Sequence, residues 1–163
     1  MKKVSVQCRN IRLAYGSTEV LKNVNLDVQP GEFFALLGPS GSGKSTLLGL
    51  MAGLDQATSG SIDLMAQNLG RLDEDGRAKL RGQFVGFVFQ SFQLVPHLNA
   101  LENVMLPLEI RGVPLTQARE LAADCLARVG LSQRLMHYPK TLSGGEQQRV
   151  ALARAFVSKP AIL

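Results

Sequence analysis

Apolar and polar residues alternate along the first part of the chain. The alternating apolar positions are Val4, Val6, Cys8, Ile11, Leu13, Tyr15, Val24, Leu26 and Val28. Successive side chains of a strand point to opposite faces of a sheet, so alternation is typical of strands with one buried face. The pattern therefore predicts an opening sheet of half-buried antiparallel strands, closed by a turn at Pro30 and Gly31.

The pattern then changes from alternating to continuously apolar. Residues 33–37 are apolar without interruption, and residues 85–89 form a second apolar run that ends at Gln90. Strands covered on both faces have this composition in parallel sheets. We therefore expect 33–37 and 85–89 to be buried strands, with a further strand at 61–64.

Helical spacing appears in three places. Apolar residues after Lys44 recur at helical intervals as far as Met51, and Gly53 is well placed to end that helix. A second apolar stripe consists of Ala118, Leu121, Ala122, Cys125, Leu126 and Val129. Gly130 follows it as a stop signal, and Cys125 is expected in the core. A last helix is expected from near Ser143 toward Ser158.

The last helix should bury Val150, Ala153 and Val157. Residues 70–82 are charged and predict a surface helix or loop. Between residues 94 and 114 the prolines at 96, 107 and 114 interrupt every periodic pattern. No element is assigned there.

Composition excludes several classes of protein. A chain of 163 residues suits one domain with a packed core. Its apolar runs are far shorter than the ~20 residues that a membrane-spanning helix needs, and Lys2 and Lys3 lead into an alternating stretch instead of an apolar export signal. Cys8 and Cys125 stand in no metal-binding spacing. We expect a cytosolic protein in a reduced compartment.

The net charge of +5 is spread along the chain without a run of five like charges. Basic residues that bind nucleic acid are usually clustered on one face or along one helix. Nucleic acid is therefore not an expected partner.

A glycine-rich loop joins the apolar run 33–37 to the first helix. Its residues are Gly38, Pro39, Ser40, Gly41, Ser42, Gly43, Lys44 and Ser45, followed by Thr46. They fit the pattern GxxxxGK[ST] in the strand–loop–helix context of a phosphate-binding loop. Glycines let backbone N–H groups point at phosphate oxygens, Lys44 can reach the β and γ phosphates of a nucleotide, and the Ser45 hydroxyl can bind Mg²⁺.

A second motif opens the last helix. Leu142 is followed by Ser143, Gly144, Gly145 and Glu146. Ser143 and Glu146 have the spacing of a capping box, in which each side chain accepts a hydrogen bond from the other residue's N–H. A capping box does not require two glycines between its members. These glycines expose a second helix N-terminus that is suited to an anion.

The two motifs together resemble the ATP-binding-cassette (ABC) ATPases, which carry an LSGGQ or LSGGE signature beside a GPSGSGKST loop. The resemblance extends over essentially the whole chain. It implies an α/β fold with an incomplete P-loop NTPase core of the RecA-like ABC type, an antiparallel β subdomain and a helical signature subdomain. Residues 1–93 and 139–163 would form the core and β subdomain, and roughly 94–138 the helical subdomain.

The resemblance also implies roles for single residues. Tyr15 would stack on adenine, and residues 38–46 would bind the phosphates of ATP. Gln90 would be the glutamine that contacts Mg²⁺ and the attacking water. Ser143, Gly144 and Gly145 would close on the γ phosphate held by a second copy in a head-to-tail homodimer. Lys44 and Gln90 are thus the expected catalytic residues, and Ser45 and Gln90 the expected metal ligands.

The stretches 85–92, 98–104 and 106–108 are similar to the branch that contains lipoprotein-release and macrolide-export ATPases. The partner would be an integral membrane permease subunit, and the location the cytoplasmic face of the inner membrane. By the resemblance, the Walker B carboxylates, the D-loop and the switch histidine would lie beyond Leu163. We therefore expect residues 1–163 to bind ATP but to hydrolyse it poorly.

Three alternatives stay open on the sequence. A cassette protein that acts on nucleic acid or ribosomes would usually carry two cassettes or a coiled-coil insertion, and neither is visible. A non-catalytic nucleotide-binding module would fit a chain that naturally ends at Leu163. A GTPase or small-molecule kinase would leave the LSGGE motif unexplained, and no NKxD guanine-reading motif is present.

Overall fold

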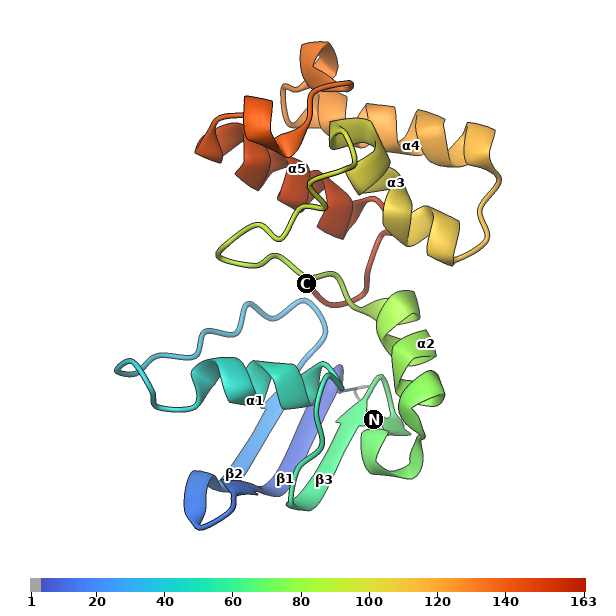
Figure 1. The fold of residues 1–163 in the computed structure, drawn as a ribbon. Coiled ribbons are helices and arrows are strands. Elements are labelled where there is room, and N and C mark those ends of the chain that lie inside the picture. Colours follow the sequence, from blue (N-terminus) through green and yellow to red (C-terminus); the bar gives the residue numbers. More distant parts are fainter. Residues whose placement is uncertain (1–3) are drawn as a thin grey trace. The chain divides into compact units, whose positions relative to one another are not determined.

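The computed structural model describes residues 4–163. These residues form two compact units, which divide between Arg81 and Gly82 (Figure 1). The division of the chain into core, β and helical subdomains that the resemblance implies stays a prediction.

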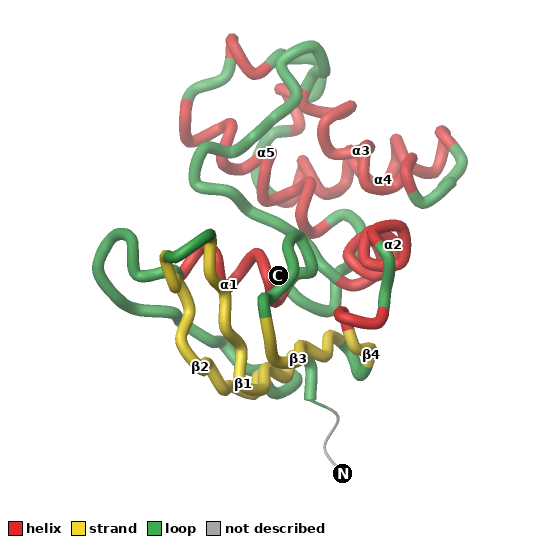
Figure 2. The backbone as a smooth tube through the Cα atoms, turned by 60° about the horizontal axis from the view of Figure 1, so that its bottom comes forward, coloured by secondary structure: helices red, strands yellow, loops and turns green. Residues whose placement is uncertain are grey.

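The first unit is built on an antiparallel sheet with the strand order β2-β1-β3-β4 (Figure 2). The central strand β1 (Val6–Tyr15) pairs with β2 (Thr18–Val28) on one side and with β3 (Ser59–Leu64) on the other. The short β4 (Gln67–Asn68) completes the sheet. The expected opening strands and the expected strand at 61–64 are confirmed.

A bulge in β1 explains why its apolar positions change from even to odd numbers. Val6 and Cys8 are buried, and so are Ile11 and Leu13. Between these pairs the register shifts, and Asn10 has a left-handed backbone with φ 52°. An extra residue at this point returns the following side chains to the buried face.

Helix α1 (Lys44–Met51) lies against the sheet and buries Leu47, Leu50 and Met51 (Figure 1). Gly53 ends it, as expected, with φ 71°. The N–H of Gly53 donates to Leu50 O (3.0 Å) and that of Leu54 to Gly49 O (2.8 Å). These bonds form a Schellman motif, which satisfies carbonyl groups at the helix end.

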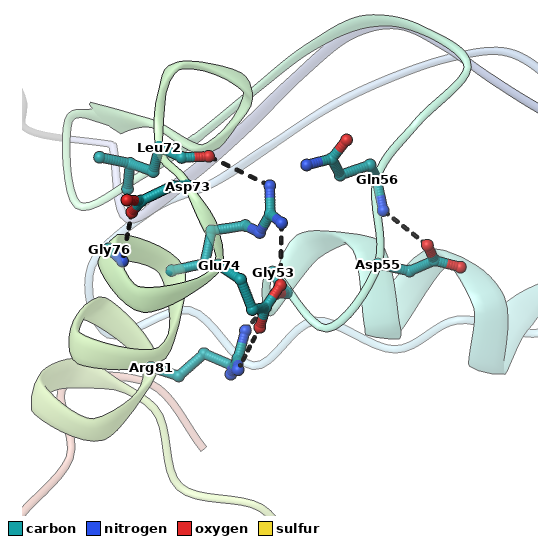
Figure 3. A network of polar contacts seen from close by, with 9 residues as sticks. Gly53, Asp55, Gln56, Leu72, Asp73, Glu74, Gly76 and Arg81 are labelled. Atoms are coloured by element: carbon teal, nitrogen blue, oxygen red, sulfur yellow. Dashed lines mark hydrogen bonds and ion pairs between the residues drawn. The ribbon is translucent and has the colours of Figure 1, made fainter.

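An arginine–glutamate network joins α2 (Glu74–Phe84) to the end of α1 (Figure 3). Arg77 is 7% exposed and donates to Glu74 Oε2 (2.8 Å). Arg81 donates to Glu74 Oε1 (3.0 Å) and to the carbonyl oxygen of Gly53. Hydrogen bonds from Arg77 and Arg81 lower the pKa of Glu74. The 3₁₀ turn η1 (Leu69–Arg71) precedes this helix, so the charged stretch 70–82 is largely helical.

The expectation of a buried strand at 33–37 is wrong. No strand is assigned there, and Phe33 and Leu37 are 95% and 91% exposed. A strand buried on both faces needs hydrogen-bonded neighbours. Within residues 4–163 no segment pairs with 33–37, so the apolar run remains a loop.

Of the expected strand at 85–89, only Val85 forms a β-bridge. Val85 forms a single parallel bridge with Ile162, in which Gly86 N–H donates to Ile162 O (2.9 Å). The rings of Phe87 and Phe89 stack with centroids 5.6 Å apart, as side chains two residues apart do along an extended backbone. The backbone is extended, but the ladder that would make it a strand is absent from the described part of the chain.

The second unit is a helical cluster. Helices α3 (Ala100–Ile110), α4 (Leu115–Arg128) and α5 (Gly144–Phe156) contact one another, and the 3₁₀ turns η2 (Ser132–Arg134) and η3 (Pro139–Thr141) connect α4 to α5. Their shared core is fully buried at Val104, Ala118, Ala122, Leu126 and Val150. Residues expected to be buried in α5 are buried, whereas Cys125, expected in the core, is half-buried at its margin.

Helix α3 was not expected from the sequence because Pro107 lies inside it. Pro107 removes the one helical bond that its N–H would make to Asn103 O, and α3 forms nevertheless because it buries Val104, Met105 and Leu108. A start signal was present in Asn99 and Glu102. Asn99 Oδ1 accepts from Glu102 N–H (2.9 Å) and Glu102 Oε2 accepts from Asn99 N–H (2.8 Å), which completes a capping box.

Candidate functional site: the phosphate loop and the signature helix

The phosphate loop approaches the sheet so closely that glycine is required where α1 begins. Gly43 is the N-cap residue, with φ 84° and no capping side chain. A Cβ atom there would lie 2.9 Å from Leu21 Cδ2 and 3.3 Å from Val20 Cγ1. Gly41 is also left-handed, with φ 79°. The sequence therefore leaves the backbone N–H groups of this loop uncovered by side chains.

The Lys44 side chain folds back over the loop. Its Nζ donates to Gly38 O (2.8 Å), Pro39 O (2.6 Å) and Ser42 Oγ (3.2 Å). These acceptors are neutral oxygens, and a phosphate oxygen would form a stronger, charge-assisted bond with the same ammonium group. Lys44 is thus held within reach of any anion that the loop binds.

The first turn of α1 provides backbone donors. Its first intrahelical bond runs from Leu47 N–H to Gly43 O (2.8 Å), so the N–H groups of Lys44, Ser45 and Thr46 precede the helical ladder. No acidic residue lies in this turn. Free N–H groups, the positive end of the helix dipole and Lys44 together suit the phosphates of a nucleotide, and the exposed Ser45 hydroxyl suits a magnesium ion.

Tyr15 ends strand β1 in the same unit. Its hydroxyl donates to Asp55 Oδ2 (3.0 Å), which raises the pKa of Tyr15, and the residue is 57% exposed. The bond fixes one end of the ring while solvent reaches much of the rest. An accessible ring with a fixed edge is suited to stacking on a planar base.

The signature residues start helix α5, as expected. Ser143 is its N-cap residue, and both halves of the capping box with Glu146 are present. Glu146 Oε2 accepts from the N–H and the hydroxyl of Ser143, each at 2.8 Å, and Glu146 Oε1 accepts from Arg134 Nε (3.1 Å). The Ser143 bonds, and then Arg134, lower the pKa of Glu146 to about 2.

Beyond the capping box, Gly144 and Gly145 are exposed at the first two positions of α5. Apart from its sequence neighbours and the backbone of α5, nothing lies within 4 Å of where a Cβ atom would stand at either glycine. The N–H groups of Gly144 and Gly145 precede the first helical bond, from Gln147 N–H to Ser143 O (2.9 Å), and neither residue has a side chain to cover them. This is the second of the two anion-suited helix starts.

Gln90 lies exposed in a turn of the second unit. The turn is held by Phe92 N–H to Phe89 O (3.0 Å), and Arg154 of α5 donates to the carbonyl oxygens of Phe92 and Gln93. Arg134 and Arg154 were not singled out from the sequence. Their partners are distant in sequence, so only the folded chain reveals them.

The structure therefore gathers the candidate residues in two groups. Tyr15 and residues 38–46 belong to the first unit, and Gln90 and Ser143 to Gly145 belong to the second. Within residues 4–163 no helix has the length and apolar character needed to cross a membrane. In the same residues no three His, Cys, Asp or Glu side chains are grouped as a metal site.

These features define a phosphate-loop nucleotide-binding protein, and comparison with known proteins gives its family. The family model described as ABC transporter matches residues 21–163. The chain belongs to the ABC transporter family, as its ATP-binding ATPase subunit. The resemblance inferred from the two motifs is confirmed.

Individual relatives agree with the family assignment. The chain is 52% identical to an uncharacterized ABC transporter ATP-binding protein, YbbA, of Escherichia coli K12, over 97% of this chain and 71% of that protein. It is 48% identical to the lipoprotein-releasing system ATP-binding protein LolD of Hydrogenovibrio crunogenus, over 99% of this chain and 72% of that protein.

A solved structure of the ATP-binding cassette MJ0796, a dimer in a post-hydrolysis state bound to ADP and Pi, is 42% identical. Its TM-score is 0.88, over 95% of this chain and 70% of that one. The expected ABC ATPase fold is thereby confirmed.

Proposed function

We propose that this chain is the motor subunit of an ABC exporter of the lipoprotein-release type. Two copies would bind Mg²⁺·ATP head to tail, and hydrolysis would drive an integral membrane permease on the cytoplasmic face of the inner membrane. Relatives named as lipoprotein-releasing ATP-binding proteins, 46–48% identical, support this branch. The solved MJ0796 dimer supports the dimeric arrangement.

The observation that carries the proposal is the presence of two glycine-bearing helix starts with exposed donors. The start of α1 would bind the triphosphate of one ATP, with Lys44 on its β and γ phosphates. The start of α5 would bring Ser143, Gly144 and Gly145 of the second copy to the γ phosphate. One helix N-terminus cannot surround a γ phosphate, whereas two from opposite sides can.

The remaining residues take supporting roles in this proposal. Tyr15 would stack on adenine. The Ser45 hydroxyl and Gln90 would hold Mg²⁺, which neutralises charge that develops on the phosphates. Gln90 would also orient the attacking water.

Nucleotide-dependent dimerisation tests this function. Analytical ultracentrifugation of the wild-type chain should show a dimer with Mg²⁺ and ATPγS but a monomer with Mg²⁺ and ADP. Ser143→Arg should remain monomeric with ATPγS, because a bulky cation replaces the N-cap that faces the second nucleotide. It should bind ATPγS as a monomer with unchanged affinity.

Gln117→Arg, at an exposed position of α4, is the matched control and should dimerise like the wild type. The proposal fails if Ser143→Arg dimerises normally. It also fails if dimers of the wild type form equally with ADP.

A further inference from the structure

The turn that bears Gln90 has an unfavourable backbone. Phe92 and Gln93 both have left-handed conformations, with φ 60° and 46°. Side-chain-bearing residues seldom adopt this region, and consecutive examples occur in tight hairpin turns, as at Met65 and Ala66, or where the surroundings impose them. The internal bonds of the turn are Phe92 N–H to Phe89 O (3.0 Å) and Gln93 N–H to Ser91 O (2.6 Å).

Arg154 supplies the outside restraint. Its Nη1 donates to Gln93 O and its Nη2 to Phe92 O, both at 2.8 Å. The rigid guanidinium fork thus binds the two carbonyl oxygens of the two left-handed residues. Arg154 is half-buried, and burial lowers its pKa.

Arg154 lies on the helix that Ser143, Gly144 and Gly145 begin. Helix α5 is continuous for 13 residues and buries Val150, Ala151 and Ala153 against its unit. A continuous, packed helix moves as a rigid rod. The turn and the signature are therefore fixed to opposite ends of one element.

The segment from residue 82 to residue 93 carries Gln90, and arginine side chains bind it at both ends. Arg154 binds its C-terminal end, and Arg111 binds its N-terminal end. Arg111, the C-cap residue of α3, donates to Gly82 O (2.6 Å), Gln83 O (3.1 Å) and Ser158 O (2.8 Å). The segment that carries Gln90 is thus attached at both ends to the helical unit, by arginine donors to backbone carbonyls.

We propose that Arg154 is a positioning residue that fastens the Gln90 turn to the signature helix, so that Gln90 and Ser143 to Gly145 shift as one body when ATP binds. The role of Gln90 as a magnesium ligand rests on the proposed function. The fastening itself is a property of this unit alone. Arg154 acts through the backbone carbonyl groups of residues 92 and 93.

Hydrogen exchange tests the fastening without any nucleotide. In Arg154→Met the amides of Phe92 and Gln93 should exchange on the order of tenfold faster, while amides in the middle of α5 keep their protection. Arg154→Lys keeps a charge but lacks the fork, and it should lose most of the same protection. Arg119→Met, an exposed arginine of α4, should exchange like the wild type.

Protection of Phe92 and Gln93 that survives in Arg154→Met, or returns fully in Arg154→Lys, would overturn the proposal. If Arg154→Met does not fold, the exchange rates of the Phe92 and Gln93 amides in Arg154→Lys decide between the two results. This result is independent of ATP, so it can fail while the proposed function stands.

A second measurement separates positioning of Gln90 from simple support of the loop. ATPγS affinity without Mg²⁺ reports the phosphate loop and should be unchanged in Arg154→Lys. The gain in affinity on adding Mg²⁺ should be reduced about fivefold, as for the loss of one hydrogen-bonded contact. If the amides of residues 92 and 93 lose protection but the gain in ATPγS affinity on adding Mg²⁺ is unchanged, Arg154 only holds the loop. That result would overturn the proposal that it positions Gln90.

Discussion

At the scale of single residues, the hydroxyl and the aromatic ring of Tyr15 have separate roles that mutation can distinguish. Its hydroxyl is bonded to Asp55, whereas its ring is exposed at the end of β1. If the ring stacks on adenine, the aromatic surface matters and the hydroxyl does not. Tyr15→Phe removes only the hydroxyl, and Tyr15→Ala removes both the hydroxyl and the ring.

We predict that Tyr15→Ala weakens ATP binding about fivefold, since aromatic stacking contributes roughly 1 kcal/mol. Tyr15→Phe should bind within about twofold of the wild type by the same argument. Inorganic triphosphate, which lacks the base, should bind all three proteins equally in isothermal titration calorimetry. Equal loss of triphosphate binding in Tyr15→Ala would assign Tyr15 to the fold instead of to adenine.

Residues that act through their neighbours in sequence could be predicted, and residues that act through the fold could not. Lys44 and Ser143 are identified by the glycines beside them. Arg134, Arg154 and Asp55 gain their significance from partners 12, 61 and 40 residues away. No spacing rule in the sequence connects these residues to partners at such separations.

At the scale of elements, the start of α5 couples helix stability to pH. Glu146 is held by Ser143 and Arg134, and its pKa falls to about 2 from the ordinary glutamate value. A carboxyl group with a lowered folded-state pKa stabilises the fold above its unfolded pKa. That stabilisation is lost as pH falls through the folded-state value.

Urea unfolding should therefore show a free energy of unfolding that declines between about pH 4.3 and pH 2 in part because of Glu146. Glu146→Gln keeps a hydrogen-bonding side chain but cannot titrate, so its decline over that window should be shallower. Glu120→Gln on the exposed surface of α4 should follow the wild type. Identical slopes for wild type and Glu146→Gln would contradict the role given to this carboxylate.

Elements with local start and stop signals were predictable. The capping box of α5 and the glycines that end α1 and α4 were all read from a few adjacent residues. Gly130, for example, has φ 74°, and the N–H of Leu131 returns to Leu126 O (2.9 Å). Helix α3 is not predicted because the prolines at 96, 107 and 114 interrupt the pattern, although Asn99 and Glu102 have the spacing of a capping box.

The prediction of strands at 33–37 and 85–89 was inaccurate for a different reason. A strand exists only where another strand pairs with it, and the described residues provide one parallel bridge for 85–89 and none for 33–37. The hydrophobic pattern indicates which segments are suited to burial. It does not indicate whether another strand is present to pair with them.

At the scale of the whole molecule, two separate sequence motifs point to one ligand. The phosphate loop alone would fit several classes of nucleotide enzyme, and the signature alone could be a capping box. Their joint presence indicated the ABC family, which the family model over residues 21–163 then confirmed. The antiparallel sheet and the helical unit support these loops in separate compact units.

The central claim is that backbone donors of residues 38–46 and the Lys44 ammonium bind the triphosphate of ATP. Isothermal titration of the chain with ATPγS and Mg²⁺ tests it most directly, with AMP as the ligand that lacks the outer phosphates. We predict that ATPγS binds and AMP does not bind measurably. Lys44→Ala should weaken ATPγS binding by at least about tenfold, the worth of a charge-assisted bond, with unchanged thermal unfolding. Equal binding of ATPγS by wild type and Lys44→Ala would contradict the account.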